Sequence, residues 1–251
     1  YAKSLGIPTI FWNKEDGVHF DRFIESAKLF DHIFTVDENC ISKYQAVVDS
    51  HVTVNTLMFA IQPSIHHFTG FHFKYNETNF VGSYSHHIHS KRRTWQNLIF
   101  EASSETKTKL TIFDRNSNRK SSKYRYPKYD NMSINTAVAY VETAQIYKDY
   151  LISFNVNTIE DSTTMFSRRL IEIIACGGIA ITNNTPAVES YFKDYCYTFK
   201  NKNELINLLN KLKEGPTEID LARAKSGAEF IAKNHTWTHR LQEIRTIIGI
   251  K

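Results

Sequence analysis

A carboxylate stands among apolar residues in the most strongly patterned stretch of the chain, "FSRRLIEIIACGGIAITNN" at 166–184. Leucine and isoleucines flank Glu172 on both sides, and a buried carboxylate must be paired or hydrogen-bonded. The vicinal hydroxyls of a ribose suit it, because one carboxylate accepts from both. Arg169 lies three residues earlier on the same helix face, so we expect the two to converge on one place. A simple ion pair on the helix surface is the alternative.

The start of this helix has the character of an anion site. The pattern predicts a helix over 163–176, capped by Thr163 or Thr164 and ended by Gly-Gly at 177–178. Free N–H groups and the positive end of the helix dipole favour an anion there. Arginines at this end oppose the dipole, and a bound anion would offset that repulsion. A diphosphate would satisfy both, although Arg168 is as well explained by solvent exposure. The side chains gathered at this helix start are Ser162, Thr163, Thr164, Met165, Ser167, Arg168 and Arg169.

Other polar residues follow predicted strands of the same region. The turn "FVGSY" at 80–84 contributes Gly82 and Ser83, and its single glycine argues against a dinucleotide-binding oxidoreductase. The next helix carries Arg92, which either reaches phosphates or belongs to a solvated basic turn. Asp114 and Arg115 come directly after another strand and contact a ligand or pair with each other.

A second group of candidates follows the first predicted strand of the chain. "WNKEDGVHF" at 12–20 contains Glu15, Asp16 and His19, which we interpret as candidates for a general base or for contacts to sugar hydroxyls. Capping of the helix that starts near Phe20 explains Asp16 equally well.

Composition and charge restrict the function classes. The 251 residues are 41% hydrophobic, enough for real cores, and the net charge of +5 suits a phosphate-bearing partner. The one basic and aromatic tract, 115–130 with Tyr126, is interpreted as a solvated loop or a nucleotide contact. We therefore expect no nucleic-acid partner, with RNA or polyanion binding through this loop as a minor alternative.

Cysteine, histidine and apolar patterns argue against several other classes. Cys40, Cys176 and Cys196 show no metal or disulfide spacing, which is typical of reduced thiols in a cytosolic protein. "HHIH" at 86–89 lacks companion ligands, so we expect no metal site. No run reaches the roughly 18 apolar residues of a membrane span. The chain starts at Tyr1 and enters a strand almost at once, which we interpret as a fragment of a longer protein.

The elements that must position these residues alternate between strand and helix. Such alternation predicts parallel sheets with crossover helices, and the break at Pro63–Thr78 predicts two units. The predicted strands are 8–12, 32–36, 52–61, 78–84, 109–114, 151–157, 178–184 and 195–199, with a strand-like piece near 135. The predicted helices are 20–30, 37–48, 90–105, 163–176, 186–192, 202–215 and 218–248, with another that ends near 150.

These residues together resemble a known family. "NVNTIEDSTTMFSRRLIEIIACGGIAITNN", with "FWNKED", "FVGSY", "IFDRN" and "YPKY", resembles the CgeB-like, spore-maturation type of glycosyltransferase, within the group-1 class of the GT-B fold. The resemblance implies an α/β protein of two Rossmann-like doubly wound parallel-sheet domains, the N-terminal one truncated. By this resemblance Glu172 is the ribose-binding glutamate, and Arg169, Arg92 and the 163–167 segment hold the donor. Many retaining members carry a second glutamate where this chain has Thr164, which leaves the stereochemistry open.

The resemblance also implies a division of the chain and a reaction. We expect a partial acceptor-side domain at 1–75, a nucleotide-sugar-binding domain at 76–235 and a closing helix at 236–251 that packs back on the first domain. The expected reaction is metal-independent transfer of a sugar from a nucleotide-diphosphate sugar, a UDP-sugar by default, to a cell-surface glycan or glycolipid acceptor. No cofactor is expected. The expected location is the cytoplasm, including the inner face of the membrane. The protein is also expected to associate peripherally with the membrane or with other domains of a longer chain. The alternative is a binding module that holds the nucleotide sugar without catalysis.

Overall fold

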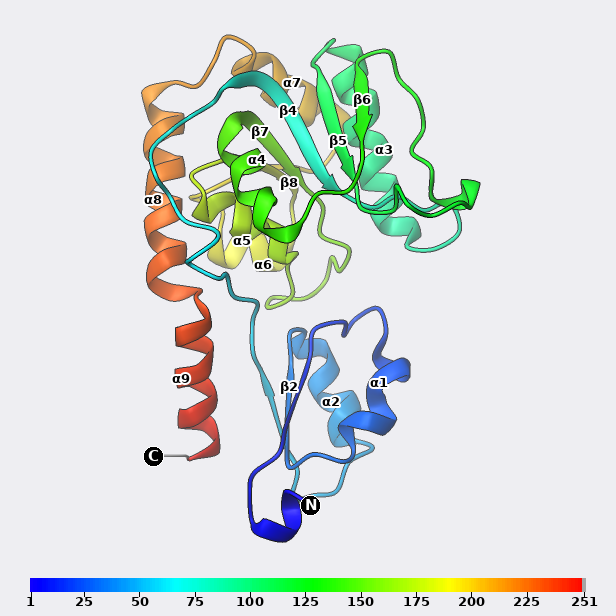
Figure 1. The fold of residues 1–251 in the computed structure, drawn as a ribbon, viewed down its shortest axis with the longest axis vertical. Helices are drawn as coiled ribbons and strands as arrows, with labels where there is room; N and C mark the ends of the chain where they lie inside the picture. Colours follow the sequence, from blue (N-terminus) through cyan, green and yellow to red (C-terminus); the bar gives the residue numbers. More distant parts are fainter. Residues whose placement is uncertain (250–251) are drawn as a thin grey trace.

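The computed structural model describes residues 1–249 and contains two separate parallel β-sheets. In Figure 1 the larger unit lies above the smaller one, and helix α9 descends beside the smaller unit. The α/β class and the parallel sheets predicted from the strand–helix alternation are confirmed.

The larger unit is built on a six-stranded sheet with the order β6-β5-β4-β7-β8-β9. This is the strand order of dinucleotide-binding Rossmann folds, and the order reverses between β4 and β7. Ligands of such sheets bind outside the carboxyl ends of the strands at this reversal, so the fold itself marks the ends of β4 and β7. The strands are β4 (Tyr75–Gly82), β5 (Leu110–Asp114), β6 (Met132–Asn135), β7 (Tyr150–Asn155), β8 (Ile179–Asn183) and β9 (Tyr197–Phe199).

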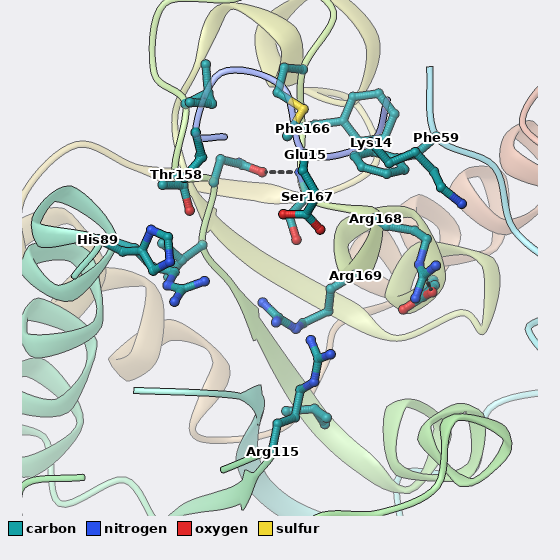
Figure 2. A pocket seen from close by; sticks show the side chains of 18 of the residues that line it. Lys14, Glu15, Phe59, His89, Arg115, Thr158, Phe166, Ser167, Arg168 and Arg169 are labelled. Carbon is teal, nitrogen blue, oxygen red and sulfur yellow. Dashed lines mark hydrogen bonds and ion pairs between the residues drawn. The ribbon is translucent and has the colours of Figure 1, made fainter. Parts of the chain in front are cut away.

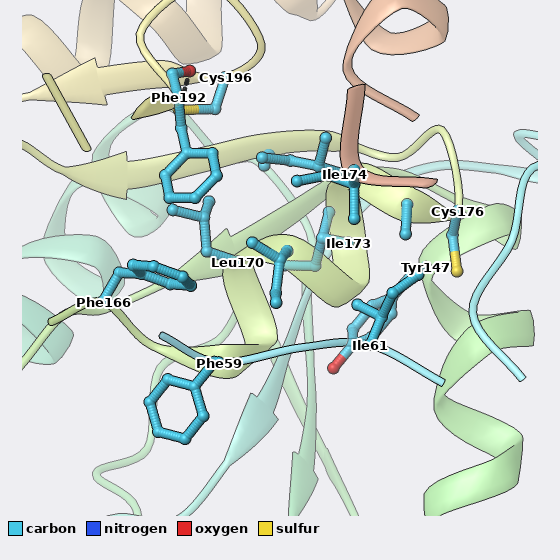
Figure 3. Close-up of a cluster of buried hydrophobic side chains, with 14 of the residues drawn as sticks. Phe59, Ile61, Tyr147, Phe166, Leu170, Ile173, Ile174, Cys176, Phe192 and Cys196 are labelled. Carbon is cyan, nitrogen blue, oxygen red and sulfur yellow. Dashed lines mark hydrogen bonds between the residues drawn. The ribbon is translucent and has the colours of Figure 1, made fainter. Parts of the chain in front are cut away.

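Helices cover both faces of this sheet. One apolar cluster, which includes Leu170 and Ile173 of α5, packs with Phe166 and Phe192 on one face (Figure 3), and a second cluster around Phe100 fills the other. Short polar caps begin several helices, for example Thr217, whose hydroxyl accepts from the Asp220 N–H. The helices are α3 (Ser90–Glu105), α4 (Thr143–Asp149), α5 (Arg168–Ala175), α6 (Pro186–Tyr191), α7 (Lys202–Leu212) and α8 (Glu218–Asn234).

The smaller unit has a three-stranded sheet in the order β1-β2-β3. Its apolar cluster, around Ile33 and Tyr44, lies under two short helices. Asp37 caps the turn after β2, where its side chain accepts from the Asn39 N–H. The elements are β1 (Ile10–Asn13), α1 (Phe20–Ala27), β2 (His32–Thr35), α2 (Ile41–Gln45) and β3 (Thr53–Thr56), with 3-10 turns at Lys3–Leu5 and Glu38–Cys40.

The last predicted helix, 218–248, is wrong, because α8 ends at Asn234 and α9 (Trp237–Ile248) begins afresh. A new capping box forms at the break, where the Thr236 hydroxyl lies 2.7 Å from Nδ1 of His239. The main chain of Ile61, in the segment that joins the two units, bonds to His235 and Trp237 on either side. The ring of Trp237 then meets that of Trp12 edge-on at 5.3 Å, so α9 contacts the smaller unit.

Two further element predictions need correction. The predicted strand 52–61 is regular only over β3, because Phe59 and Ile61 leave the small sheet and pack in the core of the larger unit (Figure 3). The strand-like piece near 135 is β6, which starts earlier and pairs in parallel with β5. Within residues 1–249, no helix has the length and apolar character needed to cross a bilayer.

Candidate active site

A cavity of about 530 Å³ lies between the two units, at the carboxyl ends of β4 and β7. Its walls come from the β1–α1 loop of the smaller unit and from α3, α5 and the strand ends of the larger one. Ten residues that the sequence singled out for a ligand site line it: Glu15, Asp16, His19, Arg92, Arg115, Met165, Ser167, Arg168, Arg169 and Glu172. Chain positions as far apart as 15 and 172 therefore share one cleft.

Three arginines, Arg92, Arg115 and Arg169, gather in this cleft. Figure 2 shows Arg115, from the end of β5, and Arg169, from α5, extending into the same space. Burial and the Arg169 cation lower the pKa of Arg92, and burial together with Arg115 lowers the pKa of Arg169. In the described part of the chain none of the three takes part in an ion pair. Like charges held together in this way favour a bound anion.

Glu172 is 4% exposed, and its partner is not the arginine that the sequence indicated. Arg168 Nε lies 2.8 Å from Glu172 Oε1, and the Tyr140 hydroxyl donates to the same oxygen at 2.9 Å. Arg169 instead lies over the Phe80 ring at 4.8 Å. Arg169 and Glu172 do converge on one cavity, but among the described residues the ion pair weighed as an alternative forms with Arg168 instead, because i,i+4 geometry places Arg168 on the carboxylate.

Arg168 and Tyr140 both contact the same oxygen of the Glu172 carboxylate. Burial raises the pKa of Glu172, and the Arg168 cation and the Tyr140 hydroxyl oppose that rise. Both donors use Oε1, so among the described residues Oε2 carries no hydrogen bond to protein. A carboxylate oxygen beside the cleft is thus left to accept from a ligand.

Buried asparagines at the ends of β7 and β8 hold the start of α5. Oδ1 of Asn157 accepts the Ser167 N–H at 2.8 Å, while its Nδ2 donates to the Thr182 hydroxyl at 3.0 Å. Asn155 Oδ1 accepts from Arg169 Nη1 at 3.4 Å. This network anchors the helix start to the strand ends, and so it fixes the directions of both arginines.

The predicted helix 163–176 begins only at Arg168, and its predicted caps serve another purpose. Thr163 and Thr164 bind Glu38 of the smaller unit: the Thr163 N–H donates to the Glu38 carboxylate at 2.8 Å, and the Glu38 N–H donates to the Thr164 hydroxyl at 3.0 Å. The hydroxyl of Ser162 accepts from the N–H groups of Thr164 and Met165. Such local side-chain bonds compete with helix formation, so this segment is a loop that joins the units.

The β1–α1 loop brings the smaller unit to the cleft. Glu15 and His19 line the cavity, and His19 meets His89 of the larger unit edge-on at 5.8 Å between ring centres. Asp16 is fully buried; its carboxylate accepts from Asn13 at 2.6 Å and from the Tyr44 hydroxyl at 2.9 Å, and burial raises its pKa to about 6. Asp16 thus shapes the loop from inside, and Glu15 and His19 present the accessible groups.

Four remaining candidates lie beside the cavity rather than in its walls. The Gly82 main chain accepts from the Arg115 N–H, and a side chain at Gly82 would collide with Phe80 and approach Arg169. Ser83 faces an adjoining polar depression of about 460 Å³ that also contains Arg115. Asp114 is 3% exposed and caps its own turn through the Asn116 N–H. Tyr126 packs against Phe100, and its buried hydroxyl has no hydrogen-bond partner among the described residues.

Several cavity residues escaped the sequence argument. Tyr140 and Thr143 lie in stretches without a recognisable motif, and His89, the last residue of "HHIH", adopts the left-handed backbone (φ 54°), which is unusual for a residue with a side chain. Lys14, next to the candidate Glu15, has its ammonium 5.1 Å from the Trp12 ring centre and 5.3 Å from that of Trp237. Asn157 is a polar residue directly after a strand, and this position is a sequence pattern that indicates a ligand site.

His86 and His87 of the motif "HHIH" form hydrogen bonds with nearby protein groups. His87 bonds to Ser85 and His86 to the Arg125 carbonyl oxygen. Across residues 1–249, no cluster of three or more His, Cys, Asp or Glu side chains is arranged to hold a metal ion.

Comparison with known proteins identifies the family. Residues 92–246 match the sequence profile of the family described as "Glycosyl transferase-like". The chain belongs to this family. No curated protein matches this glycosyl transferase-like chain in sequence.

Solved structures show the same fold as this glycosyl transferase-like protein. Anabaena HepE, in complex with UDP-glucose, is similar with a TM-score of 0.68 and 12% identity, over 99% of this chain and 74% of HepE. Sucrose-phosphate synthase from Thermosynechococcus elongatus gives a TM-score of 0.63 and 12% identity, over 95% and 64%. S. aureus TarM, in complex with fondaparinux, α-GlcNAc-glycerol and UDP, gives 0.59 and 13%, over 90% and 45%. This chain thus spans less than half of TarM and about three quarters of HepE.

Proposed function

We propose that this protein binds a nucleotide-diphosphate sugar in the cavity at the ends of β4 and β7 and transfers the sugar to a second substrate. The observation that carries the proposal is the group of Arg92, Arg115 and Arg169, three cations that share a cavity with Glu172 and have no ion-pair partner among residues 1–249. A diphosphate supplies the missing negative charge, and the free Oε2 of Glu172 accepts from the hydroxyls of an attached ribose.

The same arginines account for the chemical step. As the bond from sugar to diphosphate breaks, negative charge grows on the leaving oxygens, and cations already in place stabilise it without reorganising. The α5 N-terminus adds its dipole to this effect. We therefore propose metal-independent transfer, supported by the arginines that line the cavity proposed to hold the diphosphate.

Glu15 and His19 face the cavity from the smaller unit, which supports this unit as the acceptor side. Either residue is positioned to take a proton from an acceptor hydroxyl, as an inverting reaction requires. Thr164 stands where many retaining relatives carry a glutamate, and its hydroxyl is engaged with the main chain of Val36 and Glu38. This arrangement supports inversion over retention.

The finer assignments extend this proposal. The CgeB-like subtype, a cell-surface glycan or glycolipid acceptor, and the division into 1–75, 76–235 and 236–251 are supported by the motifs and by the two sheets. UDP-sugar as donor is supported by HepE, which was solved with UDP-glucose, and by TarM, which was solved with UDP.

A binding module without catalysis is the second candidate. The smaller sheet has three strands and the larger sheet has six, and the smaller unit is the proposed acceptor side. If the smaller unit binds the acceptor incompletely, the larger unit would still hold the nucleotide sugar, but the sugar would not be transferred.

Calorimetric titration with UDP tests the binding site. Arg169→Gln should weaken UDP binding by about 10- to 150-fold, since a hydrogen bond to a charged group contributes roughly 1.5–3 kcal/mol. Arg245→Gln, at an exposed position on α9, is the matched control and should bind like wild type. Equal UDP affinity in Arg169→Gln and wild type would refute the site. Release of sugar from UDP-sugars, with and without added glycan, then separates the enzyme from the inert module.

A further inference from the structure

The segment that joins the two units places one histidine underneath the Glu172 site. His66 lies between β3 and β4, is fully buried, and has Nε2 at 2.9 Å from the Thr143 hydroxyl. Its ring meets that of Tyr140 edge-on at 5.1 Å. Tyr140 is the residue whose hydroxyl donates to Glu172.

The hydrogen bonds around Thr143 determine how His66 is protonated. The Thr143 hydroxyl donates its single hydrogen to the Tyr140 carbonyl oxygen at 2.7 Å. It must therefore accept from His66, so the histidine carries its hydrogen on Nε2. His66 Nδ1 is buried without a hydrogen-bond partner in the described part of the chain, and a proton there would have no acceptor. Burial accordingly lowers the pKa of His66 to about 4, and the ring is neutral at pH 7.

Tyr140 is held from two sides by this arrangement. Its carbonyl oxygen is bound through Thr143, and its ring packs against His66. It sits at the start of the 3-10 turn Tyr140–Glu142, ahead of α4, and the Arg168 guanidinium covers its ring at 5.0 Å. A rotation of Tyr140 would remove one of the two donors on Glu172 Oε1.

We propose that His66 is a positioning residue for the donor site: through Thr143 and Tyr140 it holds the Glu172 carboxylate in the direction that a ribose needs. This inference rests on the proposed function. It also makes the segment between the units part of the nucleotide site, since removal of a side chain there would change donor affinity without touching the ligand.

Three variants test the proposal by calorimetry with UDP at pH 7.5. His66→Gln retains a neutral N–H near the position of Nε2 and should bind UDP within about twofold of wild type. His66→Leu lacks the donor and should weaken UDP binding by about tenfold, because loss of the hydrogen bond to Thr143 leaves Tyr140 and Glu172 less well aligned. The exposed neighbour His67→Leu is the matched control and should bind like wild type.

A double-mutant cycle separates positioning from general loosening. In a Tyr140→Phe background Glu172 has already lost the phenol donor, so His66→Leu should add less than about twofold. Thr143→Val removes the middle hydroxyl with little change of shape, and it repeats the test if His66→Leu does not fold. Full additivity of His66→Leu, or of Thr143→Val, with Tyr140→Phe would overturn the proposal.

A measurement without ligand keeps this inference distinct from the proposed function. The 13Cζ resonance of Tyr140 reports its hydrogen bond to Glu172, and it should shift in His66→Leu and Thr143→Val but not in His66→Gln. An unmoved resonance overturns the positioning role even if UDP binds. Failure of the wild-type protein to bind any nucleotide, with the resonance shifting as expected, overturns the proposed function alone.

Discussion

Arg168 Nε lies 2.8 Å from Oε1 of Glu172, one helical turn further along α5. The neighbouring Arg169 extends into the same space as Arg115 (Figure 2), and the Arg169 cation lowers the pKa of the buried Arg92. Arg168 is thus paired with a carboxylate, whereas Arg169 has no ion-pair partner among the described residues. A single helix start therefore presents an acceptor, Glu172 Oε2, and a cation side by side, as binding of a sugar hydroxyl next to a phosphate requires.

Glu172→Gln should separate ribose recognition from phosphate recognition. Loss of the carboxylate should weaken UDP binding by about 10- to 150-fold, because a charge-assisted acceptor for hydroxyls is removed. Affinity for inorganic pyrophosphate should stay equal or increase, since a negative charge leaves the cleft. Calorimetry with both ligands measures this. A parallel loss for UDP and pyrophosphate would place Glu172 on the phosphates instead.

Arg92→Gln should make the unliganded protein more stable and the complex weaker. The three arginines repel one another, so removal of one charge should raise the free energy of unfolding by about 0.5 kcal/mol, roughly 1–2 °C in Tm. The same change removes a phosphate contact and should weaken UDP binding at least about tenfold. Thermal unfolding with and without UDP gives both effects. A variant that is less stable without ligand contradicts the like-charge interpretation.

Glu38→Ala should release the loop that joins the units. The Glu38 carboxylate accepts from both the N–H and the hydroxyl of Thr163, so its loss should speed hydrogen exchange of the Thr163 amide by about tenfold or more. The start of α5, held separately by Asn157, should keep its protection. Glu25→Ala, which breaks an exposed pair with Lys28, is the control. Unchanged exchange at Thr163 would show that the hydrogen bonds between Glu38 and Thr163 do not restrain the loop.

Stability should fall as the solution is acidified, and His66 should account for part of the fall. In the folded state burial lowers its pKa from 6.5 to about 4, so between these pH values the unfolded chain binds more protons. The free energy of unfolding therefore decreases as the pH drops from about 6.5 to 4. His235 acts in the same direction, since burial and then Arg240 lower its pKa to about 3.

Asp16 opposes this trend. Burial raises its pKa from 3.8 to about 6, so its contribution to stability is lost as the pH rises through that window. Burial raises the pKa of Glu172 as well, so the contribution of His66 is isolated by substituting that residue alone. Urea unfolding at several pH values should show a slope reduced in His66→Gln by up to about 1.4 kcal/mol per pH unit. The exposed neighbour His67→Gln is the control, and an unaltered slope in His66→Gln contradicts the prediction.

The sequence by itself determined the class of fold and the neighbourhood of the site. The helix over 90–105 matches α3 residue for residue, because its apolar spacing and boundaries are local properties. Arg115 and Glu15, polar residues that each follow a predicted strand, line one cleft, although their strands belong to different sheets. Their roles in binding and catalysis stay predictions.

Only the tertiary structure decided which side chains meet. Thr163 and Thr164 looked like helix caps, but Glu38, about 125 residues earlier, binds them and moves the helix start to Arg168. Tyr140 reaches Glu172 across 32 residues, and His66 reaches Thr143 across 77. Local propensity carries no information about partners at such separations, because the order of the strands and the packing of the two units bring them together.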